Sequence, residues 1–294
     1  MSADQQTKDA TAVREQVAET YGRLASGGRG CCEGGRRSSS CSPAAEAIGY
    51  SQEDLASVPQ GAEVPTFGCG NPLAFSEVRE GETVVDLGSG AGLDLLIAAE
   101  KVGPTGRVIG VDMTDEMIEQ ARANIAAAGH THVEVRKGLI EELPVESGTV
   151  DWVISNCVIN LSPEKGRVFA EIARVLKPGG RMLVSDMVVK DLPDWVRSNA
   201  AALSACVGGA ISEEEYLAGL REAGLADVEV RARQAFGSED LQAFLASSDE
   251  LREALAGAAC CCQSSDEAAA RIGEELDGKV ASIKVFARKP GGKA

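Results

Sequence analysis

Three cysteines of this chain stand in loops where a thiol could do chemistry. Cys157 lies in SNCVINL, just after the apolar segment DWVIS; Cys69 stands between glycines in FGCGNP; Cys206 precedes two glycines in SACVGGA. A lone free cysteine is most often a small buried filler, whereas a thiol in a glycine-containing loop can move and be reached. Thiolates are soft ligands that select soft ions over hard ones. Three cysteines in such surroundings therefore favour binding of a soft atom over simple core packing.

The remaining cysteines give weaker signals. The chain has nine cysteines, and the other six lie at positions 31, 32, 41, 260, 261 and 262. None has C-x-x-C spacing, and the two histidines, His130 and His132, lie near neither cluster, so a structural zinc site is disfavoured. Adjacent helical residues point in different directions and cannot easily converge on one ion, so we interpret residues 260–262 as an accessory tail.

A glycine-rich loop, VVDLGSGAG, is the second candidate site. Gly88, Gly90 and Gly92 allow a tight turn and close approach of a ligand, although a plain strand-to-helix turn would also use them. Asp86 precedes the glycines, and Asp112 follows twenty residues after Gly92, where a carboxylate can bind both ribose hydroxyls. The spacing is G-x-G-x-G instead of the G-x-G-x-x-G of dinucleotide sites, which indicates a nucleoside cofactor without a pyrophosphate.

The elements that position these residues alternate between strand and helix from Thr83 onward, which is typical of a parallel sheet. Strands are predicted at 83–88, 106–113, 132–138, 150–156 and 181–189, and helices at 93–103, 114–129 and 166–180, the last ending in a turn. A helix at 211–225 with a Ser212–Glu215 capping box and strands at 226–236 and 280–290 could complete an antiparallel edge.

The N-terminal part differs in pattern. A helix is predicted at 8–25 with Val13, Val17, Tyr21 and Leu24 on one face, followed by a Gly-, Ser- and Cys-rich loop at 26–43. The predicted fold class is α/β: a mainly parallel, Rossmann-like sheet flanked by helices, with a Cys-containing N-terminal segment and an α+β C-terminal region. The expected domains are 1–75, 76–190 and 191–294.

Composition limits the partners and the compartment. Acidic residues outnumber basic ones by 45 to 29 for a formal charge of −16, which disfavours nucleic acid. No signal-peptide pattern opens the chain, and no apolar run reaches the roughly 18 residues that span a membrane. We expect a cytoplasmic protein, without membrane contact, that acts as a monomer.

Four motifs in order, DLGSGAG, VIGVDMT, GLIEELPVESGTVDWVISN and LKPGGRMLVSD, resemble the S-adenosylmethionine-dependent class I methyltransferases over about residues 80–190. The chain departs from many members at Leu139, where they carry Asp, so Glu141 is our choice of adenine partner. The resemblance implies a cofactor site with Asp86, Gly88 and Gly90 at the methionine half, Asp112 at the ribose, Met113 at the adenine face, Ile140 and Glu141 at the adenine edge, and Asn156 as a further contact.

The stretches GRGCCEGG, TFGCGNP, ISNCVINLSPEK and SACVGGAIS resemble, in order, the arsenite methyltransferases over most of the chain. This resemblance implies that Cys69, Cys157 and Cys206 bind trivalent arsenic. A fourth functional thiol falls in the early cluster, where Cys32 is favoured and Cys31 and Cys41 remain alternatives. The arsenic is expected to arrive as a small-molecule thiol conjugate. Electrons to restore trivalent arsenic would come from the enzyme's own thiols or from an external thiol reductant such as thioredoxin or glutathione.

The expected activity is methyl transfer from S-adenosylmethionine to trivalent arsenic held by cysteine thiolates. Arsenic bound by three sulfurs keeps a lone pair and carries no proton, so no general base is needed, in agreement with the lack of a histidine near Cys157. Two alternatives stay open. One is a C- or O-methyltransferase acting on a quinone or sterol, and the other is a non-catalytic arsenic-binding protein.

Overall fold

The computed structural model describes residues 3–26, 49–59, 70–73, 76–191, 208–239, 241 and 273–292. The helices there are α1 (Ala3–Ser26), α3 (Gln52–Leu55), α4 (Leu93–Val102), α5 (Asp115–Ala128), the short 3-10 helix η2 (Ile159–Leu161), α6 (Lys165–Val175) and α9 (Glu213–Glu222). The strands are β1 (Thr83–Leu87), β2 (Arg107–Asp112), β3 (Val133–Lys137), β4 (Val150–Asn156), β5 (Leu176–Val189), β6 (Ala226–Ala235) and β7 (Val280–Arg288).

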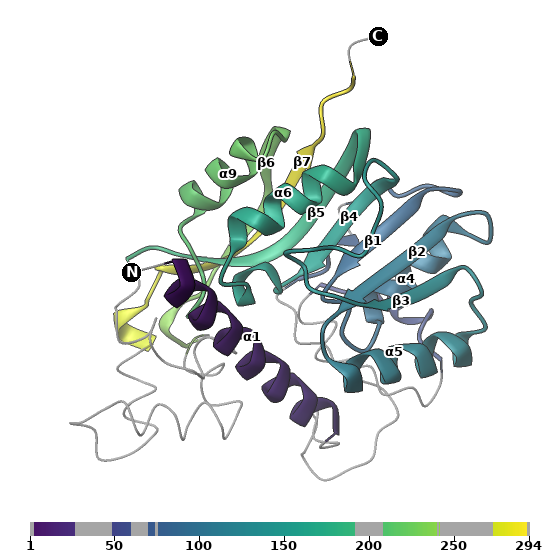
Figure 1. Ribbon diagram of the computed structural model, residues 1–294, viewed down its shortest axis with the longest axis horizontal. Helices are drawn as coiled ribbons and strands as arrows, with labels where there is room; N and C mark the ends of the chain where they lie inside the picture. The colour runs from purple at the N-terminus through teal and green to yellow at the C-terminus, as the bar shows by residue number, and fades with distance from the viewer. Residues whose placement is uncertain are drawn as a thin grey trace.

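These strands form one seven-stranded sheet in the order β3-β2-β1-β4-β5-β7-β6 (Figure 1). Strands β1 to β5 are parallel, whereas β7 pairs antiparallel with both β5 and β6. The α/β class, the parallel order and the antiparallel edge predicted from the sequence are therefore confirmed. The three-domain division stays a prediction, although β6 and β7 from its third segment complete the sheet of its second.

Both faces of the sheet are buried, as expected for parallel strands that read as apolar runs. On one face, α6 and α9 cover a cluster that includes Val85, Phe169 and Tyr216. On the other face, α4 and α5 cover a cluster that includes Leu95 and Met117. Trp152 is fully buried in this second cluster.

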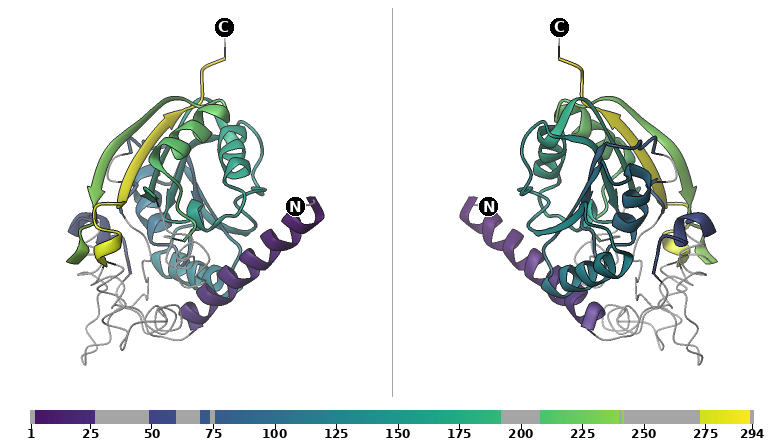
Figure 2. Two further views of the ribbon diagram at one scale, coloured as in Figure 1. Left: turned by 90° about the vertical axis from the view of Figure 1, so that its left-hand side faces the viewer. Right: turned by 90° about the vertical axis from the view of Figure 1, so that its right-hand side faces the viewer.

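Helix α1 lies apart from these layers. Figures 1 and 2 show it as an outlying helix whose C-terminal end lies beside α5. Tyr21 and Ala25 pack against the α4–α5 side of the core, and Val17 is buried. Val17 and Tyr21 of the predicted apolar face thus meet the domain.

Local signals set most element ends. Helix α5 ends at Gly129, whose φ of +75° is the left-handed conformation that stops helices, and α9 begins with the predicted capping box between Ser212 and Glu215. One boundary was wrong: the turn predicted at LKPGG is part of β5, which begins at Leu176. Leu176 pairs with Val150, and a register shift in the pairing accommodates the segment.

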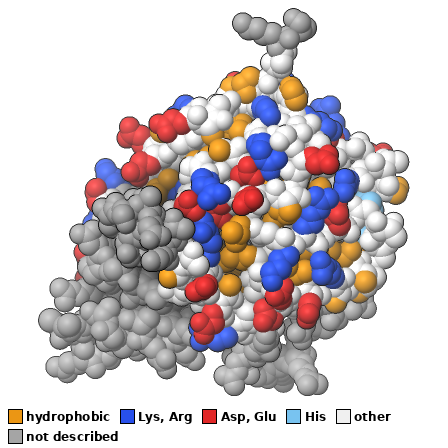
Figure 3. All heavy atoms as spheres, in the orientation of Figure 1, with side chains coloured by type: hydrophobic (Ala, Val, Ile, Leu, Met, Phe, Trp, Pro, Cys, Tyr) orange, Lys and Arg blue, Asp and Glu red, His pale blue; other side chains and the backbone are white. Residues whose placement is uncertain are grey.

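On the face drawn in Figure 3, acidic and basic side chains are interspersed and form no patch of a single sign. Within the part of the chain that the structure describes, none of the helices has the length and apolarity that a bilayer crossing requires.

Candidate functional site

The glycine loop joins β1 to α4 and forms one wall of a pocket. Gly88 has φ of +66°, and a Cβ added there would lie 2.5 Å from both methyl carbons of Val158. Such a contact is too close for any side chain, so glycine is required for conformation and for space. The N–H groups of Gly88 and Ser89 donate to the carbonyl oxygen of Val111, which fixes the turn against β2.

Asp112 is held in a fixed orientation at the end of β2. Its Oδ2 accepts a hydrogen bond from the N–H of Gly90 at 2.9 Å, and its Oδ1 accepts one from the N–H of Thr114 at 2.9 Å. Burial raises the pKa of this carboxyl above its ordinary value, while these bonds oppose the rise. Each oxygen keeps a lone pair, which is the arrangement that a ribose diol requires.

Two further carboxylates line the pocket. Asp86 on β1 and Asp94 on α4 are 3% and 7% exposed. The hydroxyl of Tyr50 donates to the Asp94 carboxylate, with its oxygen 2.9 Å from Oδ1 and 3.1 Å from Oδ2. Burial, then the charges of Asp94 and Asp112, raise the pKa of Asp86 well above its usual range, and burial raises the pKa of Asp94 to about 6. Two carboxylates in a dry site favour a cationic ligand group.

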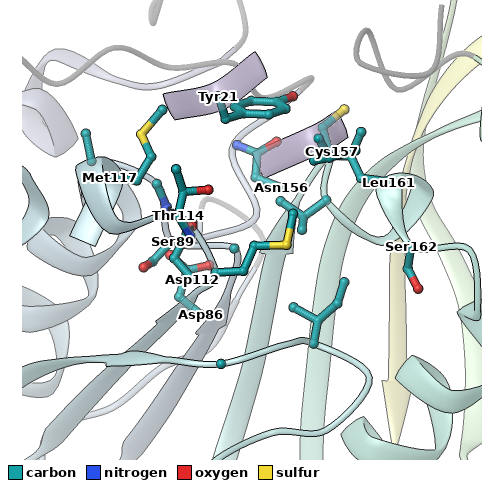
Figure 4. Close-up of a pocket in the computed structure, with 18 of the residues that line it drawn as sticks. Tyr21, Asp86, Ser89, Asp112, Thr114, Met117, Asn156, Cys157, Leu161 and Ser162 are labelled. Carbon is teal, nitrogen blue, oxygen red and sulfur yellow. Dashed lines mark hydrogen bonds between the residues drawn. The ribbon is translucent and has the colours of Figure 1, made fainter. Parts of the chain in front are cut away.

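Cys157 lies at the carboxyl end of β4, across the pocket from Asp86 and Asp112 (Figure 4). It is 4% exposed, and its φ of +60° is the left-handed region that costs a non-glycine residue about 1–2 kcal/mol. Its N–H donates to the carbonyl oxygen of Ser185 at 2.8 Å. Strain of this kind gathers at functional sites, where the surrounding structure holds it in place.

The sulfur of Cys157 is in a disulfide bond. Cys157 is the only cysteine within the described residues.

Asn156 connects the two sides of the pocket. Its Nδ2 donates to the hydroxyl oxygen of Tyr50 at 2.9 Å and to the carbonyl oxygen of Gly70 at 2.5 Å. Gly70 is also packed against β5, since a Cβ added to it would lie 2.2 Å from Oγ of Ser185. The backbone at residue 70 is thus held between the side chains of Asn156 on β4 and Ser185 on β5.

At the other end of the pocket, α1 contributes Arg14, Val17 and Tyr21 to the lining. Glu141 is 5% exposed, and its Oε1 accepts from Nε of Arg14 at 3.1 Å and from Oγ of Ser162 at 2.7 Å. Arg14 also pairs with Glu164. The carboxylate chosen from the sequence as an adenine partner is therefore tied to α1.

Nine of the residues singled out from the sequence line this one pocket: Asp86, Gly88, Gly90, Asp112, Met113, Ile140, Glu141, Asn156 and Cys157. Cys32, Cys69 and Cys206, with the alternatives Cys31 and Cys41 and the tail at 260–262, lie outside the described residues. No group of three or more metal-binding side chains occurs among the residues that are described.

Sequence reasoning missed Tyr50, Asp94 and Arg14. One signal was available for Asp94, because an acid interrupts the apolar helix start in GLDLLIAA. Tyr50 and Arg14 carry no local signal, because their partners in the pocket lie between 44 and 150 residues away in the sequence.

The chain is similar in sequence to known proteins. A family model described as a methyltransferase domain matches residues 79–224. An arsenite methyltransferase of Halobacterium salinarum is 46% identical over 249 residues, 78% of this chain and 62% of the relative, and one of Aquipseudomonas alcaligenes is 34% identical over 70% of this chain and 60% of the relative. The chain thus spans about three fifths of the length of these two curated relatives.

The crystal structure of an arsenic(III) S-adenosylmethionine methyltransferase from Chlamydomonas reinhardtii superposes with a TM-score of 0.59 at 31% identity. The match covers 86% of this chain and 75% of that structure. Together with the glycine loop, the paired carboxylates and the cysteine at the end of β4, these likenesses show that the chain belongs to the family of S-adenosylmethionine-dependent arsenite methyltransferases.

Proposed function

We propose that this chain transfers methyl groups from S-adenosylmethionine to trivalent arsenic that its cysteine thiolates hold. The observation that carries the proposal is the position of Cys157, which lines the same pocket as Asp86 and Asp112. A soft thiophilic atom bound there would lie beside the site for a nucleoside cofactor.

The residues present suit S-adenosylmethionine. Asp86 and Asp94 are buried carboxylates in need of a cation, and the amino acid end of the cofactor supplies one. Asp112 presents two oriented oxygens to a ribose, and Met113 with Ile140 offers apolar surface to a base. When bound, the cofactor supplies an electrophilic methyl group on a sulfonium centre. The chain's own residues orient it and exclude water, and orientation of this kind can lower a barrier by roughly 7–11 kcal/mol.

Cys69, Cys157 and Cys206 are proposed as the arsenic ligands, with Cys32 as a fourth thiol and Cys31 or Cys41 as alternatives. Gly70, which follows Cys69 directly in the sequence, is anchored to Asn156 and packed on Ser185. The substrate would be trivalent arsenic as a thiol conjugate, handled by a single chain.

A thiol reductant such as thioredoxin or glutathione is part of the proposal. Cys157 is in a disulfide, and a sulfur in that state has no thiolate to offer to arsenic. Thiol–disulfide exchange with an external thiol would release it. Turnover should therefore depend on the added thiol.

The test combines the purified, reduced chain with S-adenosylmethionine, arsenite and a thiol, followed by detection of methylated arsenic and S-adenosylhomocysteine. Cys157→Ser should abolish methylarsenic formation and retain cofactor binding, while Cys260→Ser serves as the matched control that keeps activity. Retained turnover in Cys157→Ser would reject the proposal. A quinone or sterol enzyme would yield no methylated arsenic, and a simple binder would hold arsenic without consuming the donor.

A further inference from the structure

A continuous chain of hydrogen bonds runs from the cofactor pocket to Gly70. The Tyr50 hydroxyl donates to Asp94 and accepts from Nδ2 of Asn156, and the same Nδ2 donates to the carbonyl oxygen of Gly70. A hydroxyl has one proton to give, so Tyr50 can accept from Asn156 only along its lone pairs while it points that proton at Asp94. The bond from Tyr50 to Asp94 therefore fixes Asn156 as the donor in the bond between Asn156 and Tyr50.

Most members of this chain are buried, which makes their bonds costly to lose. Tyr50 is 3% exposed and Asp94 7% exposed, Gly70 is buried, and Asn156 is half-buried. In such surroundings a polar group left without its partner keeps its full desolvation cost. The four residues act as one connected unit for this reason.

We propose that Tyr50 is a positioning residue for the methyl transfer, tying the Asp94 carboxylate in the cofactor pocket to Asn156 and through it to the backbone at Gly70. Gly70 follows Cys69 directly in the sequence. A ligand cation beside Asp94 keeps the carboxylate ionised, so Tyr50 keeps its proton pointed there and Asn156 keeps its hold on Gly70. Occupation of the cofactor site and the position of the backbone at Gly70 are linked in this way.

The charges around Asp94 define a signature of this role. Asp94 is faced by Tyr50 and Asp54 from the segment around α3, by Asn156 from β4, and by Asp86 from β1. Burial raises the pKa of Asp94 to about 6, and the hydrogen bond from Tyr50 opposes part of that rise. Removal of the hydroxyl should raise the pKa of Asp94 further, so any binding that needs the carboxylate should fail at a higher pH.

The experiment measures binding of S-adenosylhomocysteine and of arsenite to the reduced full chain by calorimetry, from pH 5 to 8, in wild type and Tyr50→Phe. In wild type, S-adenosylhomocysteine should tighten arsenite binding about fivefold. In Tyr50→Phe this coupling should fall below about twofold, and the acidic limb of S-adenosylhomocysteine binding should move up by roughly 0.5–1 pH unit. Unchanged coupling with an unmoved limb would overturn the proposal.

Tyr216→Phe is the matched control. Tyr216 is fully buried and its hydroxyl donates to the buried Asp186 at 3.2 Å, so the substitution removes the same group from the same kind of pair. It should lower stability to a similar degree without a change in the coupling or in the acidic limb. A shift as large as that of Tyr50→Phe would show a general effect of lost stability and count against the proposal.

A second variant keeps the proposal testable if Tyr50→Phe does not fold. Gly70→Ala places a Cβ 2.2 Å from Oγ of Ser185 and should displace the segment while the Tyr50–Asp94 bond remains. The coupling should then be lost and the acidic limb should stay in place; a retained coupling would contradict the proposal.

The inference rests on the proposed function, yet the two fail differently. If wild type forms no methylated arsenic, the proposed function fails, while the pH dependence of S-adenosylhomocysteine binding still tests Tyr50. If wild type methylates arsenite and Tyr50→Phe behaves like it in every measurement, only the role of Tyr50 is rejected.

Discussion

Two buried tyrosine–aspartate pairs lie on opposite faces of the sheet, Tyr50–Asp94 beside the pocket and Tyr216–Asp186 under α6 and α9. Asp186 has its oxygens satisfied by the protein. Oδ1 accepts from the side chain of Asn160 at 2.7 Å and from the N–H of Met187 at 2.9 Å, and the positive charge of Lys165 opposes the rise of its pKa.

The Tyr50–Asp94 pair has acidic neighbours instead of a basic one. The charge of Asp54 raises the pKa of Asp94, and the charges of Asp94 and Asp112 raise that of Asp86. Carboxylates gathered in this way cost free energy unless a cation joins them. The comparison teaches that the same two residue types serve structure where the protein completes their bonding and mark a ligand site where it does not.

The largest expected difference between the pairs is in cofactor affinity. Asp86→Asn should weaken S-adenosylmethionine binding about 10- to 100-fold, because a buried charged partner of the ligand is lost. Asp186→Asn should change that affinity less than about twofold. Calorimetry on both variants checks this, and equal losses would mean that the two sites are not distinct in function.

Next in size is the dependence of cofactor binding on pH. Burial raises the pKa of Asp94 to about 6. Below pH 6 the carboxyl group is mostly protonated, and a bound cation must displace this proton. Affinity for S-adenosylmethionine should then be constant above about pH 7 and fall up to about tenfold per pH unit below 6. Asp186→Asn should follow the wild-type profile, and a flat profile in wild type would speak against an ionised carboxylate in the complex.

The Tyr216–Asp186 pair should make the free energy of unfolding depend on pH. Burial raises the pKa of Asp186 to about 7, so between its unfolded value and 7 the folded state binds more protons than the unfolded state. The free energy of unfolding should therefore fall as pH rises through that window, by roughly 1–3 kcal/mol for this group. Denaturant unfolding of Asp186→Asn from pH 5 to 8 should give a flatter curve than wild type; an identical slope would remove Asp186 as the cause.

The smallest effect is expected at the cover of the pocket. Arg14 pairs with Glu141 and Glu164, and the Glu164 side chain is 35% exposed, so solvent screens part of the attraction. Arg14→Met should raise the dissociation rate of S-adenosylhomocysteine about threefold or less. High salt should speed release from wild type more than from the variant in stopped-flow measurements, and an equal response would exclude this ion pair.

Much of the fold could be predicted from the sequence, because its signals are local. Gly88 and Gly90 mark the turn after β1, Gly129 marks the end of α5, and the apolar runs mark strands buried on both faces. Asp112 could be placed as well, because the alternation of strand and helix fixes its distance from the glycine loop.

The rest depends on contacts between distant parts of the chain. Tyr50 meets Asn156 across 106 residues, and Arg14 meets Glu141 across 127, and neither pairing leaves a pattern in its own segment. The start of β5 at Leu176 was missed for a related reason, because proline and glycines locally favour a turn, whereas pairing of Leu176 with β4 and of Gly179 and Gly180 with Lys289 extends the strand.

The place of β7 has a consequence for how the molecule is made. The last strand in the sequence lies between β5 and β6, and it pairs with every residue of β5 from Arg181 to Val189. On the ribosome, β5 and β6 must wait with open hydrogen-bonding edges until residue 288 has emerged. A chain shortened before Val280 would keep the glycine loop, Asp86 and Asp112. The hydrogen-bonding edges of β5 and β6 would then be open to pairing with a strand of another molecule.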